Sequence, residues 1–107
     1  QADEVSRPLV PPIDVTVWRL VEKTVQGTGV PASITHASQI SVIVNLCGPV
    51  EQWEDLRIRL ETLGTKSIEG ELYGKVVSAE RHLDSCTALV RLTSMSPHVH
   101  QYLTKPA

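Results

Sequence analysis

The stretch Gln39-Ile-Ser-Val-Ile-Val-Asn-Leu-Cys47 indicates the fold class more clearly than any other part of the chain. It is rich in β-branched residues, which favour strands, and Gly48-Pro49 ends it. Side chains in a strand point alternately to opposite faces. One face is then fully apolar, with Ile40, Val42, Val44 and Leu46. The other face is mixed, so we expect a sheet that helices cover on one side.

A helix is expected from Val50 to Leu63, directly after this strand. Pro49 suits the first helical position, and Gly64 suits a left-handed C-terminal cap. Between them an apolar stripe recurs at helical spacing, made of Val50, Trp53, Leu56, Leu60 and Leu63. These features predict an amphipathic helix that packs on the sheet.

An earlier helix is expected to begin at Asp14, whose carboxylate can accept hydrogen bonds from the free amides of a first turn. Gly27 and Gly29 end the segment, and Pro31 prevents its continuation. Its apolar residues at helical spacing are Val17, Leu20, Val21 and Val25. The segment is also rich in β-branched residues, which lose side-chain freedom in helices and weigh against this prediction.

Two more strands are expected, at about Ser67–Ala79 and Cys86–Thr93. Together with the helices they predict an α+β fold, in which two helices lie on one face of a mostly antiparallel sheet. The expected domain covers residues 14–95. Prolines near each end mark residues 1–13 as a linker and residues 96–107 as a tail.

Composition narrows the classes of partner. The chain has 107 residues, enough for one domain, and 41% of them are hydrophobic. The net charge of −2 shows no basic excess, so nucleic acid and anionic membrane surfaces are not expected partners. No window approaches the roughly 18 apolar residues that span a bilayer. Because the chain begins with Gln1 rather than Met, we expect a fragment or processed product whose upstream membrane anchor could be missing.

The sequence shows no catalytic motif. It lacks a Gly-x-Ser-x-Gly nucleophile motif and a Cys-x-x-Cys pair. Glu69 and Glu71 could share a strand face, but exposed carboxylates beside lysines are the ordinary interpretation. His98 and His100 could share a face and bind zinc, although a solvated pair is the simpler interpretation. We therefore expect no enzyme, cofactor or bound metal, and a metal-dependent enzyme is the least favoured alternative.

Two cysteines allow either of two states. Cys47 ends one expected strand and Cys86 begins another, so antiparallel strands would bring both sulfurs to one end of the sheet. A disulfide there would contribute ~4 kcal/mol by the chain-entropy argument. The alternative, which we favour, is two buried free thiols that act as small hydrophobes.

Four residues are candidates for an interface with another protein. Trp18 and Trp53 lie on the expected helices, where a partly exposed indole would mark a binding surface. Leu72 and Tyr73 lie on the expected strand 67–79. For both tryptophans, packing in the core is the competing interpretation.

The order of elements resembles the small ferredoxin-like periplasmic domains of inner-membrane platform proteins in type II secretion and type IV pilus systems. The resemblance covers residues 14–94 and is carried by Ile40–Leu46, the stripe in Val50–Leu63 and the strand Cys86–Leu92. It implies a ferredoxin-like two-layer sandwich without catalytic residues. It also implies a periplasmic domain, anchored in the inner membrane through a segment outside this chain, that forms homodimers or heterodimers.

We therefore expect a non-enzymatic assembly or interaction domain of a bacterial cell-envelope machine. An exposed edge, at Ser67–Ala79 or Cys86–Thr93, would pair with a strand of the partner. The alternative is a regulatory domain that binds a small molecule of the amino-acid type. There, Cys47-Gly48-Pro49 would contact the ligand at the N-terminus of the second helix.

Overall fold

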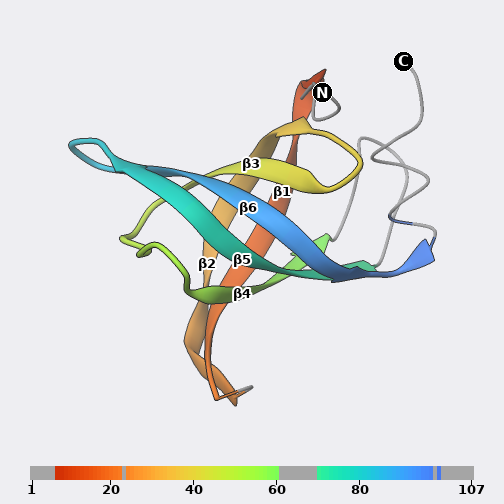
Figure 1. The fold of residues 1–107 in the computed structure, drawn as a ribbon. Helices are drawn as coiled ribbons and strands as arrows, with labels where there is room; N and C mark the ends of the chain where they lie inside the picture. Colours follow the sequence, from red (N-terminus) through yellow and green to blue (C-terminus); the bar gives the residue numbers. More distant parts are fainter. Residues whose placement is uncertain (1–6, 23, 61–69, 98, 100–107) are drawn as a thin grey trace.

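The computed structural model describes residues 7–22, 24–60, 70–97 and 99, and within them the chain forms one antiparallel barrel (Figure 1). Its six strands are β1 Arg7–Val21, β2 Thr24–Ala37, β3 Ser41–Leu46, β4 Asp55–Leu60, β5 Gly70–Arg81 and β6 Cys86–Met95. The order around the barrel is β1-β2-β3-β6-β5-β4, and the pairing of β4 with β1 closes it.

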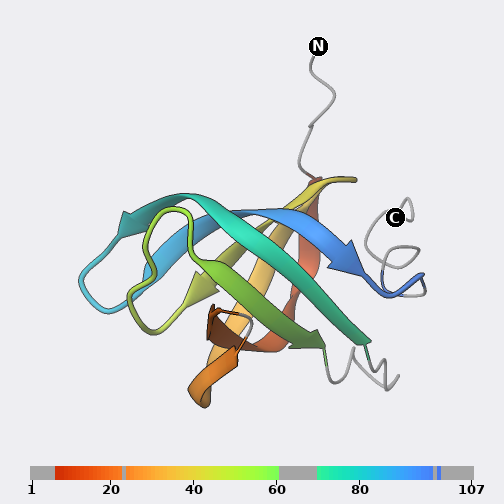
Figure 2. The same cartoon turned by 60° about the horizontal axis from the view of Figure 1, so that its bottom comes forward.

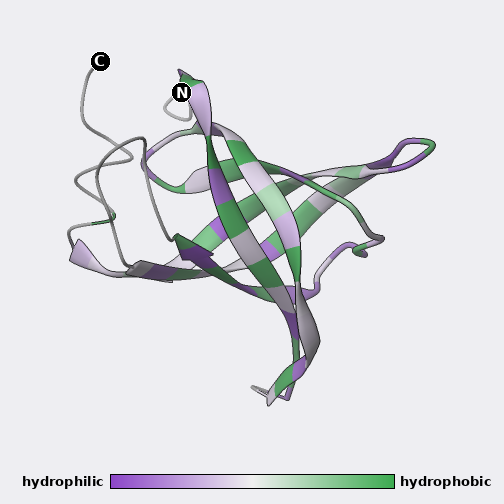
Figure 3. Cartoon of the chain, turned by 180° about the vertical axis from the view of Figure 1, so that it is seen from behind, coloured by the Kyte–Doolittle hydropathy of each residue, from purple (hydrophilic) through white to green (hydrophobic). Residues whose placement is uncertain are grey.

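Aliphatic side chains fill the barrel because alternate residues of each strand point inward. In β4, Leu56, Ile58 and Leu60 are fully buried, while Arg57 and Arg59 lie on the outer face. The same alternation of hydrophobic and hydrophilic residues is visible along the other strands (Figure 3). Further buried residues of the core are Ile13, Val15, Val17, Ile34, Val42, Val44, Leu72, Val76, Ala88, Val90 and Val99.

The predicted α+β ferredoxin-like sandwich is wrong, because strands take the place of both expected helices in the described part of the chain. The segment that begins at Asp14 belongs to β1 and β2, which meet at a turn around Glu22. Its many β-branched residues fit a pleated sheet better than a helix. The strand preference of these residues therefore determines the structure here, and the helical spacing of the apolar residues does not.

The helix expected from Val50 to Leu63 is also wrong. Residues 51–54 form a loop, β4 follows at Asp55–Leu60, and residues 61–63 lie outside the described part. Leu56 and Leu60 fit both the helical stripe and strand alternation, since four residues is a multiple of the strand period of two. Ile58 distinguishes a strand from a helix. It lies between Leu56 and Leu60 in the sequence and is buried, as strand alternation requires and the helical stripe does not.

The three predicted strands are present. β3 lies within Gln39–Cys47, and β6 begins at Cys86 and extends to Met95. β5 covers the described part of Ser67–Ala79 and continues to Arg81. At the N-terminal end, β1 starts at Arg7, so residues 7–13 of the expected linker belong to the barrel.

The predicted strand edges are not edges of an open sheet. β5 lies between β4 and β6, and β6 lies between β5 and β3. Barrel closure therefore gives both strands two neighbours. β5 is nevertheless longer than β4, and its pairing with β4 ends at Lys75. No helix in the described ranges is long and apolar enough to cross a bilayer.

Candidate functional site

Two connections lie together at one end of the barrel, where we place the candidate site (Figure 2). They are the β3–β4 loop, residues 47–54, and the β5–β6 turn, residues 82–85. β3 and β6 are paired with Leu46 opposite Cys86, so the loop leaves β3 beside the point where the turn enters β6. We call the surface of these two connections the loop end.

Trp53 is the most conspicuous residue of the loop end. Its side chain is 60% exposed, and its backbone has a φ of 73°. An aromatic residue in this left-handed region is unusual, because its Cβ crowds the following carbonyl oxygen at a cost of about 1–2 kcal/mol. Such a conformation persists only where the surrounding structure enforces it, and these positions are concentrated at functional sites.

Backbone hydrogen bonds hold this loop against β5. The Trp53 amide donates to the carbonyl oxygen of Val76 at 2.6 Å, and the Val76 amide donates to the carbonyl oxygen of Glu54 at 2.8 Å. The side-chain amide of Gln52 donates to the carbonyl oxygen of Val77 at 2.9 Å. Trp53 and Glu54, which directly precede β4, thus extend its hydrogen bonding along β5 beyond Lys75. These bonds fix the backbone on both sides of the Trp53 side chain.

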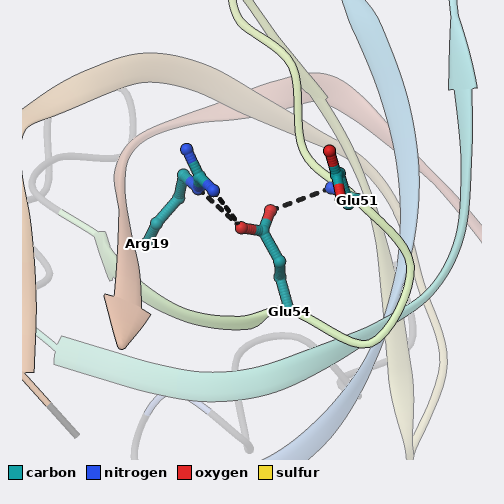
Figure 4. A network of polar contacts seen from close by, with 3 residues as sticks. All are labelled: Arg19, Glu51 and Glu54. Atoms are coloured by element: carbon teal, nitrogen blue, oxygen red, sulfur yellow. Dashed lines mark hydrogen bonds and ion pairs between the residues drawn. The ribbon is translucent and has the colours of Figure 1, made fainter. Parts of the chain in front are cut away.

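Glu54 fixes the loop from a second direction (Figure 4). Nε of Arg19, on β1, donates to Oε2 of Glu54 at 2.7 Å, and a second guanidinium nitrogen contacts the same oxygen. Oε1 of Glu54 accepts from the Glu51 amide at 2.8 Å. One carboxylate therefore connects the two ends of the turn at residues 51–54 and also links this turn to β1 in the barrel wall. The exposed indole of Trp53 therefore lies on a loop that hydrogen bonds hold against both β1 and β5.

Open grooves flank this loop. One, of about 320 Å³, lies between Cys47-Gly48-Pro49 and the turn at residues 82–85, whose Leu83 is 96% exposed. A second, of about 390 Å³, lies between Val50–Gln52 and the end of β5. Arg81 lines both grooves. The loop end thus combines two exposed apolar side chains with open grooves lined by both polar and apolar groups, which is the composition of a protein-binding surface.

Both cysteines belong to this end of the barrel and both are free thiols. Cys86 is buried in the core opposite Leu46, whereas Cys47 is exposed just beyond the end of β3. One sulfur therefore points into the barrel and the other toward solvent, so the structure contains no bond between them.

The other predicted interface residues lie elsewhere. Trp18 and Tyr73 are half-buried on the outer face, on either side of Arg57 along the strand pairing. The Arg57 guanidinium lies 4.9 Å from the centre of the Trp18 ring. Leu72 points the opposite way from Tyr73 and is fully buried, so it is not available to a partner of the folded barrel.

Arg57 also forms an ion pair with Glu71, one of the two glutamates that could share a strand face. The hydrogen bond from Arg57 lowers the pKa of the Glu71 carboxyl, and the same contact raises the pKa of Arg57. The Tyr73 hydroxyl donates to Glu71 at 3.3 Å. Glu71 is thus the ionised half of a surface ion pair, while Glu69 lies outside the described residues.

The described residues hold no group of three or more His, Cys, Asp or Glu side chains that could bind a metal ion. His98 and His100 lie outside the described part of the chain. No protein-family model matches the chain, and no curated protein matches it.

Sequence reasoning missed Leu83 and Glu54. Leu83 carried a usable signal, because a leucine between His82 and Asp84 in a polar turn has no core to enter. Glu54 carried none, since its partner Arg19 is distant in the sequence and the two meet only when β4 pairs with β1.

Proposed function

We propose that this barrel is a non-enzymatic protein-interaction domain and that it binds its partner through the loop end. The observation that carries the proposal is Trp53, an exposed indole in a left-handed backbone conformation on a loop that hydrogen bonds hold in place. Tryptophan is the residue type most enriched among the side chains that dominate binding energy. An anchor that is already fixed loses little conformational entropy on association.

A second copy of the chain is the partner to test first, because dimer formation is the mode of action expected from the sequence. Leu83 and Trp53 supply apolar contact area, and the grooves beside them can receive side chains of the other copy. The role does not depend on a secretion or pilus machine, whose resemblance relied on helices that are strands here. The periplasmic location likewise stays a prediction from the sequence.

Sedimentation equilibrium over a wide range of protein concentration tests self-association. We expect a reversible dimer that reductant does not change. Trp53→Ala is expected to weaken dimer formation by roughly tenfold or more, as truncation of a central aromatic anchor does. Val21→Ala is the control, because Val21 is also a half-exposed apolar residue but lies at the β1–β2 turn. Equal weakening by both variants, or a wild-type protein that is monomeric at every concentration, would contradict self-association through the loop end.

A second candidate is small-molecule binding in the groove beside Cys47-Gly48-Pro49. The predicted helix N-terminus is absent there, but the groove exists and the polar residues His82 and Asp84 line it. A thermal-shift series with single amino acids tests this function, because a ligand that binds only the folded state raises the melting temperature. Unchanged melting temperatures at millimolar amino acid would reject it.

A further inference from the structure

Within the described ranges, β5 leaves part of its backbone without a strand partner at the loop end. Its pairing with β4 ends at Lys75, yet β5 continues to Arg81. The loop satisfies only the first residues beyond that point, through the bonds of Trp53 and Glu54 to Val76 and the bond of Gln52 to Val77. The remaining residues of β5 have β6 on one side and no strand on the other in the described part of the chain.

The register of the β5–β6 hairpin shows which amides face the open side. The His82 amide donates to the carbonyl oxygen of Ser85 at 2.8 Å, so these two residues form a hydrogen-bonded pair. Antiparallel pairing alternates hydrogen-bonded with non-hydrogen-bonded pairs. Ala79 and Arg81, opposite Ala88 and Cys86, are non-hydrogen-bonded positions. Their N–H and C=O groups therefore point away from β6, toward the open side.

The second groove runs along this open edge. Ser78, Ala79 and Arg81 form one side of it, and the loop residues 50–52 form the other. The Arg81 guanidinium makes no ion pair with any described residue. Among the described residues, the groove thus offers backbone groups and a guanidinium without partners side by side, and Trp53 lies on the loop that forms its far wall.

We infer that this groove binds an extended peptide segment of a partner protein, which adds as a strand to Ala79–Arg81 and places a carboxylate beside Arg81. Strand addition takes its affinity from main-chain hydrogen bonds and its specificity from side-chain contacts. The Arg81 guanidinium can bind a carboxylate through two parallel hydrogen bonds. The inference rests on the proposed function, because it names what the loop end binds.

The carboxylate preference applies to one position of the peptide only. Glu51 lines the same groove, but it lies next to Gln52, which binds Val77. Arg81 lies at the other end, where β5 enters the turn. An acidic residue of the peptide is therefore favoured at the end nearest the turn and disfavoured beside Glu51.

Selection from a displayed library of random heptapeptides tests the inference without a known partner. We expect the wild-type protein to enrich peptides with Asp or Glu at one fixed position. Arg81→Glu should reverse that preference to Lys or Arg. Ala79→Pro removes the amide that faces the groove and should abolish binding, whereas Ala79→Ser keeps the amide and should bind. Glu51→Gln is a control that should leave the acidic preference intact.

Hydrogen exchange provides a second measurement if Ala79→Pro fails to fold. A synthetic copy of an enriched peptide should slow exchange of the Ala79 and Arg81 amides in the wild-type protein by at least about tenfold. Unchanged exchange at both amides would overturn the inference, and so would a library without enriched peptides.

The outcomes also separate this inference from the proposed function. Peptides that are lost with Trp53→Ala but bind Ala79→Pro and Arg81→Glu normally would reject strand addition, yet they would support the loop end as a binding surface. A protein that neither self-associates nor enriches any peptide would reject both.

Discussion

The guanidinium of Arg57 lies 4.9 Å from the centre of the Trp18 ring, on the outer face of the barrel where β4 pairs with β1. Gly29 of β2 lies against the same indole, since a Cβ at this glycine would be 2.9 Å from two ring carbons of Trp18. Glu71 of β5 holds the guanidinium from the other direction. These contacts connect β2, β1, β4 and β5 from outside, at the seam where the barrel closes.

Gly29→Ala should destabilise the barrel because the added methyl group has no space between Trp18 and Thr16. We expect a loss of about 1–3 kcal/mol, as for overpacking elsewhere. The urea midpoint measures it. Gly48→Ala is the matched control, since its Cβ would be 3.9 Å from the nearest atom, in Val30, which is ordinary contact. Equal midpoints for the two variants would show that the indole moves aside at little cost.

Glu71 should contribute stability that depends on pH. Its hydrogen bond from Arg57 lowers the pKa of the folded carboxyl, so the contribution is complete above the usual range of a glutamate and is lost as the pH falls through the lowered pKa. Because the pair is partly exposed, we expect under about 1 kcal/mol at neutral pH. Wild type and Glu71→Gln should therefore differ at neutral pH and converge at an acid pH below the lowered pKa of Glu71.

Urea unfolding at both pH values measures this difference. Glu80→Gln is the control, because Glu80 is exposed and forms no ion pair within the described ranges. A difference between wild type and Glu71→Gln that persists unchanged at low pH would contradict the assigned role of the ion pair.

The two cysteines should differ in reactivity. Cys47 is exposed and should react at once with an aromatic disulfide reagent, whereas Cys86 is buried and should react only after unfolding. We expect one reactive thiol in buffer and a second in denaturant. Cys47→Ser should remove the fast reaction. Unfolded wild-type protein with no reactive thiol before reduction would instead demonstrate a disulfide.

Glu54→Ala should loosen the loop more than it destabilises the barrel. The variant loses the contacts of the carboxylate with Arg19 and with the Glu51 amide, which we expect to cost about 1–2 kcal/mol. Hydrogen exchange should show faster exchange of the Glu51 amide with little change in β3 or β6. Asp55→Ala, which removes a more exposed ion pair with Lys75, is the control. It should change neither the exchange of the Glu51 amide nor the stability of the barrel. Uniformly faster exchange would mean that Glu54 supports the whole fold instead.

The strands were predictable from the sequence where the two-residue period of a strand alone accounted for the spacing of the apolar residues. Val42, Val44 and Leu46 alternate in β3, and all three are buried as expected. In β4 two periods compete: Pro49 and Gly64 favour a helix between them, whereas the structure has a loop at residues 51–54 and β4 at Asp55–Leu60. Only Ile58 distinguished the two, since an alternating strand buries it and the helical stripe does not include it.

The candidate site was predictable in part. The residue type of Trp53 predicts an interface, and the structure places its side chain on an exposed loop. Trp18, chosen for the same reason, packs against Gly29 and Arg57. The difference depends on pairing between distant strands, which local spacing does not encode. The open edge at Ala79 is of the same kind, because it arises from the unequal lengths of β4 and β5.

Trp53→Gly should separate stability from binding. Glycine adopts a positive φ without strain, so the change removes a cost of about 1–2 kcal/mol. The exposed indole contributes little burial, and we therefore expect the free energy of unfolding to stay equal or to rise by up to about 1 kcal/mol. Association through the loop end should weaken as is expected for Trp53→Ala.

The matched control is Trp18→Gly, which removes the packing against Gly29 and Arg57 and should destabilise the barrel by roughly 1–3 kcal/mol. Urea unfolding and sedimentation equilibrium on both variants measure the two properties separately. A Trp53→Gly protein that is much less stable than wild type would show that the indole holds its own loop in place. In that case the strain at Trp53 would serve the fold, and the loop end would lose its main support as a binding surface.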